Sequence, residues 1–405
     1  MKTAYLTAGV PTLNATLYWK LRFSVGDPAA LIEFVEPQPV NIKEAQKSKN
    51  DALLTSSTTR LLILRDIEMD RAIQTANADY IACPANFKPE SGLSGDREIA
   101  TAQSVAEALR RYKITKVISD RSLPFLFADL IRQNGIEIEC DINRGVLERR
   151  SKDSQEIAWI REAQKTTEDV MTMACRMVAN AEADSGGILY QNGEILTSEM
   201  VRAAIDHFLL DRGYANVPSI VAGKKDGGDC HELGTGPLKT GEPVIIDIFP
   251  TNMTTRYNGD CTRTVIHGTV DPVYTRIHEA VCAAKKAAMS TIRAGVSAET
   301  VHRATIKTLE AYGFGYAFPG SAEAANEIRL THGTGHGLGL SVHEPPLLDF
   351  GGPELVVGDV VSVEPGLYSK TFGGIRIEDM VVVTENGCEN LGQPIPESLN
   401  WGDCQ

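Results

Sequence analysis

The stretch Thr331-His332-Gly333-Thr334-Gly335-His336-Gly337-Leu338-Gly339-Leu340-Ser341-Val342-His343-Glu344 places three histidines among glycines, with apolar residues alternating near its end. Glycine lets the backbone pack closely against its neighbours, so the histidines can aim their imidazoles at one point. Imidazole is a frequent metal ligand in proteins. The stretch is therefore interpreted as the middle of a metal site.

Four carboxylates lie in strand-like segments on either side of this stretch: Asp247, Asp260, Glu364 and Glu378. One imidazole with four carboxylates is a ligand set for two divalent cations. Hard oxygen ligands with a single imidazole suit Mn²⁺, Co²⁺, Fe²⁺ or Zn²⁺, and the absence of thiolates argues against a closed structural zinc site. Two such cations share a bridging water and polarise a carbonyl, which is the chemistry of amide or ester hydrolysis.

The first pair of carboxylates is expected to meet across a hairpin. Asp247 follows the apolar run Val244–Ile246, and an ionised carboxylate in such company must be paired or bind metal. Asp260 lies 13 residues on (260 − 247), a distance that lets a hairpin bring both carboxylates to one face. Taken alone, Asp260 also fits an ordinary turn.

The second pair is arranged in the same way. Glu364 ends a strand, because Pro365 cannot continue a paired interior strand. Glu378 lies 14 residues on (378 − 364), and alternation places Arg376 on the same face. Taken alone, Arg376 and Glu378 also fit a surface ion pair, but together the five positions indicate a dinuclear site.

Length, charge and cysteine usage indicate the class of protein. At 405 residues the chain suggests two or three domains, and its net charge of −13 disfavours binding to nucleic acid or to anionic membranes. The eight cysteines are scattered without a CxxC pair, which favours reduced thiols. With no leader-like start and no apolar run of membrane length, we expect a soluble, cytoplasmic enzyme.

The chain alternates apolar runs with helical patterns. Over the first 145 residues this predicts a small α/β domain. The predicted strands are 61–64, 116–119, 135–140, 219–222, 243–249, 261–266, 360–364 and 375–383. The predicted helices are 100–112, 124–133, 154–181, 197–212, 272–294 and 298–312. The polar run Arg149–Asp153 is predicted to be a linker and a helix start, and Thr197 to cap the helix that follows it.

Four motifs carry a resemblance to a known family: Asp-x-Thr-Arg-Thr at 260, Gly-His-Gly-x-Gly-Leu-x-Val-His-Glu at 335, Glu-Pro-Gly-Leu-Tyr at 364 and Gly-Ile-Arg-Ile-Glu-Asp at 374. In this order they resemble the pita-bread metallopeptidases, the family of aminopeptidase P, prolidase and methionine aminopeptidase, over about residues 150 to 395. The earlier part is similar to the creatinase-like N-terminal domain of aminopeptidase P and prolidase. The expected fold is thus an α/β creatinase-like domain, 1–148, followed by an α+β pita-bread catalytic domain, 149–405.

The resemblance implies metal ligands and two divalent ions, with Mn²⁺ the first expectation. It makes Asp247, Asp260, His336, Glu364 and Glu378 the ligands, with Asp260 and Glu378 bridging and Glu364 also acting as general base.

The resemblance also implies roles for residues outside the ligand set. His343 is expected to contact the substrate's proline or carbonyl, and His231 to steady the leaving amine or the tetrahedral intermediate. Arg376 is expected to hold the carboxylates in place. The substrate is a proline-containing peptide, and a homodimer or tetramer is expected, with the N-terminal domain completing a partner's cleft.

Other histidines and one cysteine are predicted to be structural. His332 matches no ligand position, and His207, His267, His278 and His302 are expected at the surface or in packing. Cys261, beside a ligand, is expected to be buried and inert.

Two departures from the family pattern bear on the substrate. The hairpin tip Asn252–Asn258 is longer than is usual, which can reshape the substrate entrance. Many prolidases carry an arginine just after the second His-Glu, where it would grip a dipeptide's carboxylate, but no arginine occurs between His343 and Glu364. An Xaa-Pro aminopeptidase is therefore placed ahead of an Xaa-Pro dipeptidase, although Arg256 could take the place of the missing arginine.

A creatinase-type hydrolase without metal and a non-enzymatic binding module are weaker alternatives, because all five ligand positions are filled.

Overall fold

The computed structural model describes residues 2–35, 45–49, 58–317 and 327–402. The chain divides into two compact units, Met1–Arg149 and Arg150–Gln405. None of the helices in the described ranges is long and apolar enough to cross a bilayer. Of the eight cysteines, seven lie in the described ranges and all seven are free thiols, whereas Cys404 lies outside them.

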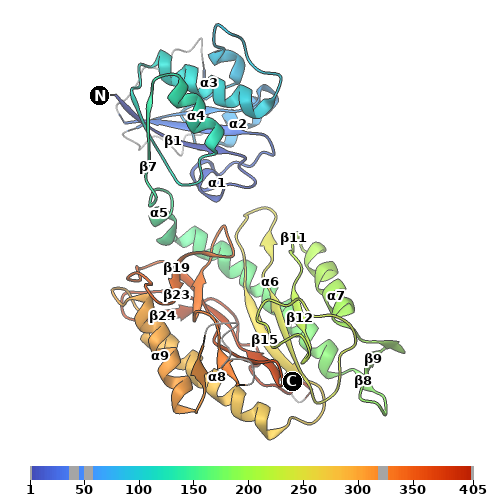
Figure 1. Ribbon diagram of the computed structural model, residues 1–405. Helices are drawn as coiled ribbons and strands as arrows, with labels where there is room; N and C mark the ends of the chain where they lie inside the picture. Colours follow the sequence, from blue (N-terminus) through green and yellow to red (C-terminus); the bar gives the residue numbers. More distant parts are fainter. Residues whose placement is uncertain (1, 36–44, 50–57, 318–326, 403–405) are drawn as a thin grey trace. The chain divides into compact units, whose positions relative to one another are not determined.

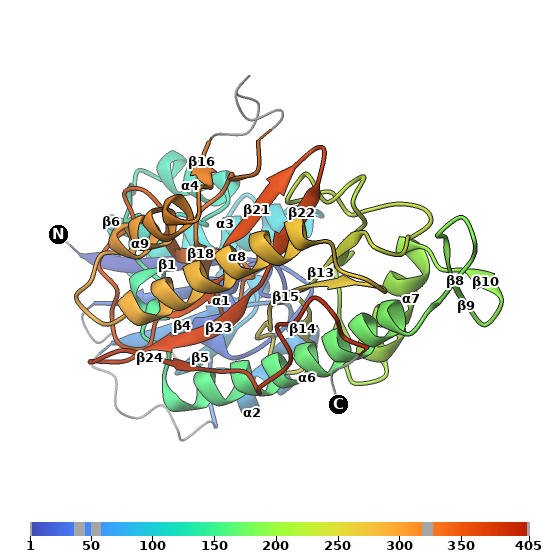
Figure 2. The ribbon, with the colours of Figure 1, turned by 90° about the horizontal axis from the view of Figure 1, so that it is seen from below.

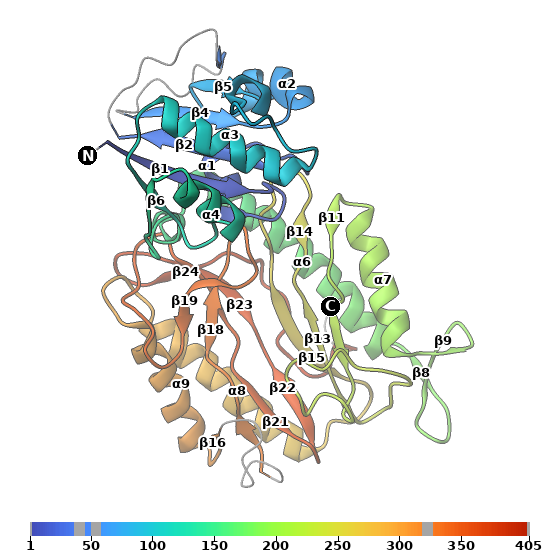
Figure 3. The same ribbon diagram turned by 45° about the horizontal axis from the view of Figure 1, so that its top comes forward.

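The first unit is built on one mixed sheet with the strand order β3-β5-β4-β2-β1-β6-β7 (Figures 1 and 3). Its strands are β1 (Thr3–Gly9), β2 (Ala29–Phe34), β3 (Gln46–Lys47), β4 (Thr59–Ile63), β5 (Tyr80–Ala82), β6 (Lys116–Ser119) and β7 (Glu137–Cys140). Its helices are α1 (Ala15–Leu21), α2 (Met69–Thr75), α3 (Arg97–Arg111) and α4 (Phe125–Gln133), and α5 (Leu147–Arg150) follows. The predicted α/β class is confirmed, but β1, β2, β3, β5, α1 and α2 were not predicted.

The strand β2, which was not predicted, is buried on both faces of the sheet. All six residues of β2 are buried, since α3 and α4 pack on one face of the sheet and α1 and α2 on the other. A strand covered on both faces loses its alternation of polar and apolar residues, so its period gives no clear signal.

The second unit begins with the long helix α6 (Ser154–Ala179) and ends in a group of antiparallel strands. Its other helices are α7 (Ser198–Leu210), α8 (Pro272–Thr291) and α9 (Ala298–Ala311). The strands up to α8 are β8 (Glu182–Ala183), β9 (Leu189–Gln191), β10 (Glu194–Ile195), β11 (Tyr214–Ala215), β12 (Ile220–Ala222), β13 (Pro243–Ile248), β14 (Thr251–Asn252) and β15 (Cys261–Ile266). The later strands are β16 (Gly315–Tyr316), β17 (Arg329–Leu330), β18 (Gly335–Gly337), β19 (Glu344–Leu348), β20 (Val360–Val363), β21 (Gly366–Ser369), β22 (Gly373–Arg376), β23 (Asp379–Val383) and β24 (Cys388–Asn390).

This unit has two halves, each with strands covered by helices. In the first half, the sheet β12-β13-β15 packs its apolar side chains against α6 and α7. In the second half, α8 and α9 lie side by side and cover the sheets β19-β18-β20-β23-β24 and β16-β17-β21-β22 (Figure 2). The α+β class predicted for this region is confirmed.

The helices α6 and α7 start where the sequence predicted, and α7 has the predicted cap. Thr197 accepts a hydrogen bond from the amide of Met200 at the start of α7, and Asp153 caps α6 in a reciprocal capping box. The polar run before α6 is not a solvated linker, however. Arg150 and Lys152 are buried, and they pair with Asp359 at 2.6 Å and with Glu344 at 2.7 Å.

The segment 375–383, predicted as one strand, is two strands. β22 ends at Arg376 and pairs with β21, whereas β23 begins at Asp379 and pairs with β20. The backbone amide of Glu378, in the break, donates to the carbonyl of Thr262. This bond to a third strand redirects the chain from one sheet to another, which a strand period cannot reveal.

A glycine allows the histidine stretch to reach its place. A Cβ on Gly335 would lie 2.0 Å from the carbonyl oxygen of Ser362, so β18 can approach β20 this closely only without a side chain. The Ser362 hydroxyl accepts a hydrogen bond from the amide of His336 across the same contact.

We expect Gly335→Ala to destabilise the protein by about 2 kcal/mol or more, because the added methyl forces backbone to move in a packed sheet. Thermal melting followed by circular dichroism measures this as a drop of several degrees. Gly387→Ala is the matched control, since a Cβ there meets nothing within 4 Å. Equal melting temperatures for the two variants would contradict the close approach of β18 and β20.

Candidate metal centre

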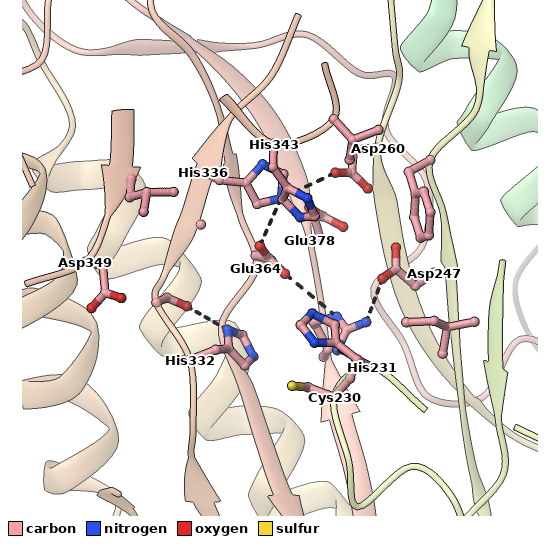
Figure 4. A pocket seen from close by; sticks show the side chains of 17 residues that line it. Cys230, His231, Asp247, Asp260, His332, His336, His343, Asp349, Glu364 and Glu378 are labelled. Carbon is pink, nitrogen blue, oxygen red and sulfur yellow. Dashed lines mark hydrogen bonds and ion pairs between the residues drawn. The ribbon is translucent and has the colours of Figure 1, made fainter. Parts of the chain in front are cut away.

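Five side chains predicted as ligands converge from five separate parts of the second unit. Asp247 lies on β13 opposite Thr262, and Asp260 comes just before β15. Glu364 follows β20, Glu378 lies between β22 and β23, and His336 is the middle residue of β18 (Figure 4). Each predicted acidic pair is thus carried by antiparallel strands, β13 with β15 and β20 with β23.

All five side chains line one cavity of about 280 Å³. Its other lining residues are Ile220, Cys230, His231, Phe249, His332, Gly333, Gly335, Val342, His343, Leu347, Asp349 and Arg376. The cavity therefore contains every residue for which the sequence predicted a catalytic or metal-binding role. Asp349 and Leu347 lie there without having been predicted.

Three of the five predicted ligands are close enough to hold one ion together. Ligand atoms of Asp260, His336 and Glu378 lie within 4.8 Å of one another, and all three residues are buried. Glu364 is adjacent, with Oε1 3.4 Å from Nε2 of His336. Asp247 is turned toward Arg376, whose guanidinium donates to its Oδ2 at 2.7 Å.

The tautomer of His336 follows from its neighbours. Nδ1 lies 3.2 Å from the carbonyl oxygen of Gly337, which can only accept, so Nδ1 carries the proton. Nε2 then presents a lone pair to Glu364 and to Asp260, whose Oδ2 lies 3.7 Å away. Burial lowers the pKa of His336, which favours this neutral form. A nitrogen lone pair that faces two carboxylates would repel them, and a cation bound between the three groups removes this repulsion.

The carboxylates also show that the residues fit a metal. Among the described residues, Oδ1 of Asp247 and Oε1 of Glu378 are buried without a hydrogen-bond partner. Burial, followed by the charges of neighbouring carboxylates, raises the pKa of Asp260 and of Glu378 well above the ordinary range. Burial likewise raises the pKa of Glu364 to about 7. Such clustered buried acids are costly unless protonated or bound to cations.

Arg376 organises the carboxylates from behind. Besides Asp247, its guanidinium bonds to the hydroxyl groups of Thr262 at 3.1 Å and Tyr368 at 2.8 Å, and its Nε lies 3.9 Å from Oε2 of Glu364. Thr262 in turn donates to Oε2 of Glu378 at 2.8 Å. One buried guanidinium thereby orients carboxylates from both hairpins.

His332, predicted to be structural, belongs to the same network. Its Nε2 lies 2.8 Å from the Tyr368 hydroxyl, and its Nδ1 lies 2.7 Å from the carbonyl oxygen of Gly333. Burial lowers its pKa to about 3, so it is neutral. It extends the chain of bonds from Arg376 and also forms part of the cavity wall.

Two further histidines face the cavity. The ring of His343 lies 4.3 Å from that of His336, edge to face, and burial lowers its pKa. His231 is exposed, and Figure 4 shows it beside Cys230 on the side of Asp247. Both are reachable from solvent and stand outside the ligand cluster, as groups that contact a substrate must.

The long hairpin tip packs onto α6 and the histidine stretch. Tyr257 is buried, stacks on Trp159 with ring centroids 5.6 Å apart and bonds to Glu156. The Asn258 amide donates to the carbonyl of Gly339 at 2.8 Å. Arg256 is not among the residues that line the cavity. Between Asp247 and Asp260, Phe249 is the residue that lines the cavity in the described structure.

Cys261 and the four other histidines lie outside the cavity lining. Cys261 is fully buried, and burial raises its pKa, so the thiol is inert as predicted. His267 and His278 bond to backbone carbonyls, and His207 is exposed on α7. His302 is fully buried but lies 3.3 Å from the cavity residue Asp349.

Comparison with known sequences gives relatives with two kinds of activity in their names. The Xaa-Pro dipeptidase of Pyrococcus furiosus is 33% identical over 163 residues, 40% of this chain and 43% of that protein. Xaa-Pro aminopeptidase 2 of Streptomyces coelicolor is 34% identical over 187 residues, 41% of this chain and 39% of that protein. The chain spans about half the length of the curated relatives it matches.

Solved structures show the same fold over the whole chain. The prolidase of Pyrococcus horikoshii superposes with a TM-score of 0.73 at 21% identity, covering 98% of this chain and 95% of that one. The X-Pro aminopeptidase of Thermotoga maritima gives a TM-score of 0.74 at 22% identity, covering 98% and 97%. The predicted two-domain pita-bread fold is confirmed.

The model of one family matches residues 158–385, more than half of the chain, and that range contains every side chain of the candidate metal centre. The protein belongs to metallopeptidase family M24.

Proposed function

We propose that the cavity holds two divalent cations and that the protein is a peptidase that cleaves the bond between an N-terminal residue and a penultimate proline. The observation that carries the proposal is the convergence of His336 Nε2 with the buried carboxyl groups of Asp260, Glu364 and Glu378. The names of the M24 relatives, which include Xaa-Pro dipeptidases and an Xaa-Pro aminopeptidase, support the substrate class.

In this proposal Asp247, Asp260, His336, Glu364 and Glu378 would hold the cations. When bound, the cations supply a water of lowered pKa and polarise the scissile carbonyl. Mn²⁺ is the first expectation, because oxygen ligands dominate the set. Arg376 keeps Asp247 and Glu364 oriented whether or not the cations are present.

The remaining groups act on the substrate. Glu364, which lines the cavity with Oε1 3.4 Å from Nε2 of His336, takes the proton from the attacking water. His343 donates a hydrogen bond to the substrate carbonyl as negative charge develops on its oxygen. His231, on the opposite side of the cavity, steadies the leaving amine (Figure 4).

The second candidate is an Xaa-Pro dipeptidase, which the relative from Pyrococcus furiosus favours by name. Among the described residues that line the cavity, Arg376 is the one arginine or lysine, and it is paired with Asp247. A dipeptidase needs a cation for the substrate's carboxylate, so the aminopeptidase stays ahead. Both candidates share the chemistry and differ in the length of peptide accepted.

We further propose that the N-terminal unit, whose boundary falls near residue 149, is a creatinase-like domain that carries no chemistry of its own and completes the cleft of a partner subunit. We also propose a homodimer or tetramer and a cytoplasmic location. The reduced cysteines and the acidic composition support the last of these.

The function is tested with the chelated protein, to which Mn²⁺ or Co²⁺ is added back. We expect cleavage of Xaa-Pro-Yaa peptides after the first residue to depend on the added ion, and replacement of the second residue by alanine to reduce kcat/KM strongly. Mass spectrometry of the products identifies the bond cut. Cleavage that is unaffected by the chelator, or that ignores proline, contradicts the proposal.

Metal binding is expected to weaken as pH falls below about 7. Burial holds the pKa of Glu364 at about 7 in the metal-free protein, so at lower pH a cation must displace its proton. Affinity for Mn²⁺ therefore rises as pH increases through about 7, where Glu364 loses its proton. Titration calorimetry in two buffers of different ionisation enthalpy measures both the affinity and the proton release. Binding with no release of protons at pH 6 would show that the acids are not the ligands.

We expect Glu364→Gln to lower kcat by about 10³-fold or more while the protein stays folded, because the general base is lost. Glu385→Gln, which removes an exposed acid in the turn between β23 and β24, is the control and is expected to keep full activity. Circular dichroism checks the fold of both variants. Full activity of the Glu364 variant would remove it from the mechanism.

His343→Ala is expected to lower kcat by about 10²-fold, the loss typical of one hydrogen bond to a developing oxyanion. Steady-state kinetics on one Xaa-Pro-Yaa peptide measures it. His207→Ala, at an exposed position on α7, is the matched control. If the two variants share the same kinetics, His343 has no part in the reaction.

A further inference from the structure

A fifth carboxylate lines the cavity apart from the four clustered acids. Asp349 follows β19, and its side chain is 38% exposed. Figure 4 shows it on the side of His332, away from Asp247 and Asp260. Asp349 lies shortly after the Pro345-Pro346 pair and outside the four family motifs, so no role was predicted for it.

The position of Asp349 is fixed by buried neighbours. His302 on α9 is fully buried, with Nδ1 2.9 Å from the Thr334 hydroxyl and Nε2 3.3 Å from Oδ1 of Asp349. Nε2 of His302 has no aligned hydrogen-bond partner among the described residues and points to this carboxylate. The amide of Phe350 donates to the same oxygen at 2.7 Å.

The histidine stretch leaves room for this carboxylate. A Cβ on Gly333 would lie 3.2 Å from Cβ of Asp349 and 3.3 Å from its carboxyl carbon. A side chain at this position of the motif would press on Asp349, so Gly333 and His302 together define where it stands.

The charge of Asp349 is not balanced by a basic residue in the described part of this unit. Burial lowers the pKa of His302, which is therefore neutral. Arg376 pairs with Asp247, and Arg303 pairs with Glu299 at 2.6 Å while stacking on Phe350. The segments of this unit outside the description, 318–326 and 403–405, contain no lysine, arginine or histidine.

We propose that Asp349 is a specificity-determining residue that excludes substrates with a free carboxylate directly after the penultimate proline and favours peptides that continue with an amide, above all with a basic residue. This inference rests on the proposed function and refines its substrate class.

The physical reason is an uncompensated negative charge in a confined site. The four clustered carboxylates balance the charge of two divalent cations, and the one positive charge of Arg376 is held against Asp247 at 2.7 Å, on the side of the cavity away from Asp349 (Figure 4). Asp349 therefore has no cationic side chain beside it among the described residues of this unit. An Xaa-Pro dipeptide carries its carboxylate on the residue next to the scissile bond, within the same cavity, where like charges repel through a medium less polar than water. In a longer peptide that carboxylate becomes a neutral amide, and a following basic side chain is attracted.

The test compares Ala-Pro, Ala-Pro-amide and Ala-Pro-Lys as substrates of the metal-loaded full chain. We expect the wild type to prefer the amide to the free acid, and Asp349→Asn to reduce this ratio of kcat/KM values about tenfold, mainly by improving KM for the acid. Asp349→Lys is expected to reverse the preference toward Ala-Pro. Glu310→Gln, which removes an exposed acid from α9, is the control and keeps the wild-type ratio.

The outcomes separate this inference from the proposed function. If the wild type cleaves these peptides but Asp349→Asn alters acid and amide by the same factor, Asp349 does not sense the carboxylate and the inference is overturned. The inference is also overturned if Asp349→Asn raises KM equally for all three substrates. Asp349 would then bind the N-terminal ammonium group that the three share. If the folded, metal-loaded wild type cleaves none of the three, the proposed function fails and the inference with it.

Discussion

The main physical constraint on the second unit is the free energy that it costs to hold four carboxylates and the lone pair of an imidazole close together, away from water. In the described structure Asp260, His336 and Glu378 approach one another within 4.8 Å, and burial raises the pKa of both acids. Such an arrangement opposes folding unless protons or cations occupy it. Much of the surrounding structure can be understood as the means of holding these groups in place.

Three buried ion pairs brace the strands that carry the acids. Arg376 holds Asp247 from one sheet while it extends from another. Arg263 on β15 and Lys285 on α8 both pair with Asp379, the first residue of β23. A buried pair is a weak source of stability but is costly to break, so these contacts favour a single relative placement of β15, β22 and β23.

The cavity also explains how a peptidase site could choose its substrate without a dedicated cation for a carboxylate. The acid cluster and Arg376 lie on one side of it, whereas Asp349, in the loop after β19, lies on the other side with His302 of α9 behind it. In the proposed function, reaction chemistry and selection of peptide length would therefore depend on different residues. The loop after β19 contains none of the five proposed metal ligands.

The sequence by itself predicted the residues that the structure brings together in the cavity, the order in which they occur, the helix start near Asp153 and the cap of α7. These depend on local chemistry: a carboxylate beside Val244–Ile246 requires a partner, and Thr197 and Asp153 satisfy free amides at helix starts. Tertiary structure decided what depends on contacts between distant residues. The break between β22 and β23 arises from the bond of Glu378 to Thr262. Arg150 and Lys152 are buried by Asp359 and Glu344, about 200 residues later in the chain. Asp349 enters the cavity because Gly333 and His302 leave it that position, and no local pattern records an interaction between residues so far apart.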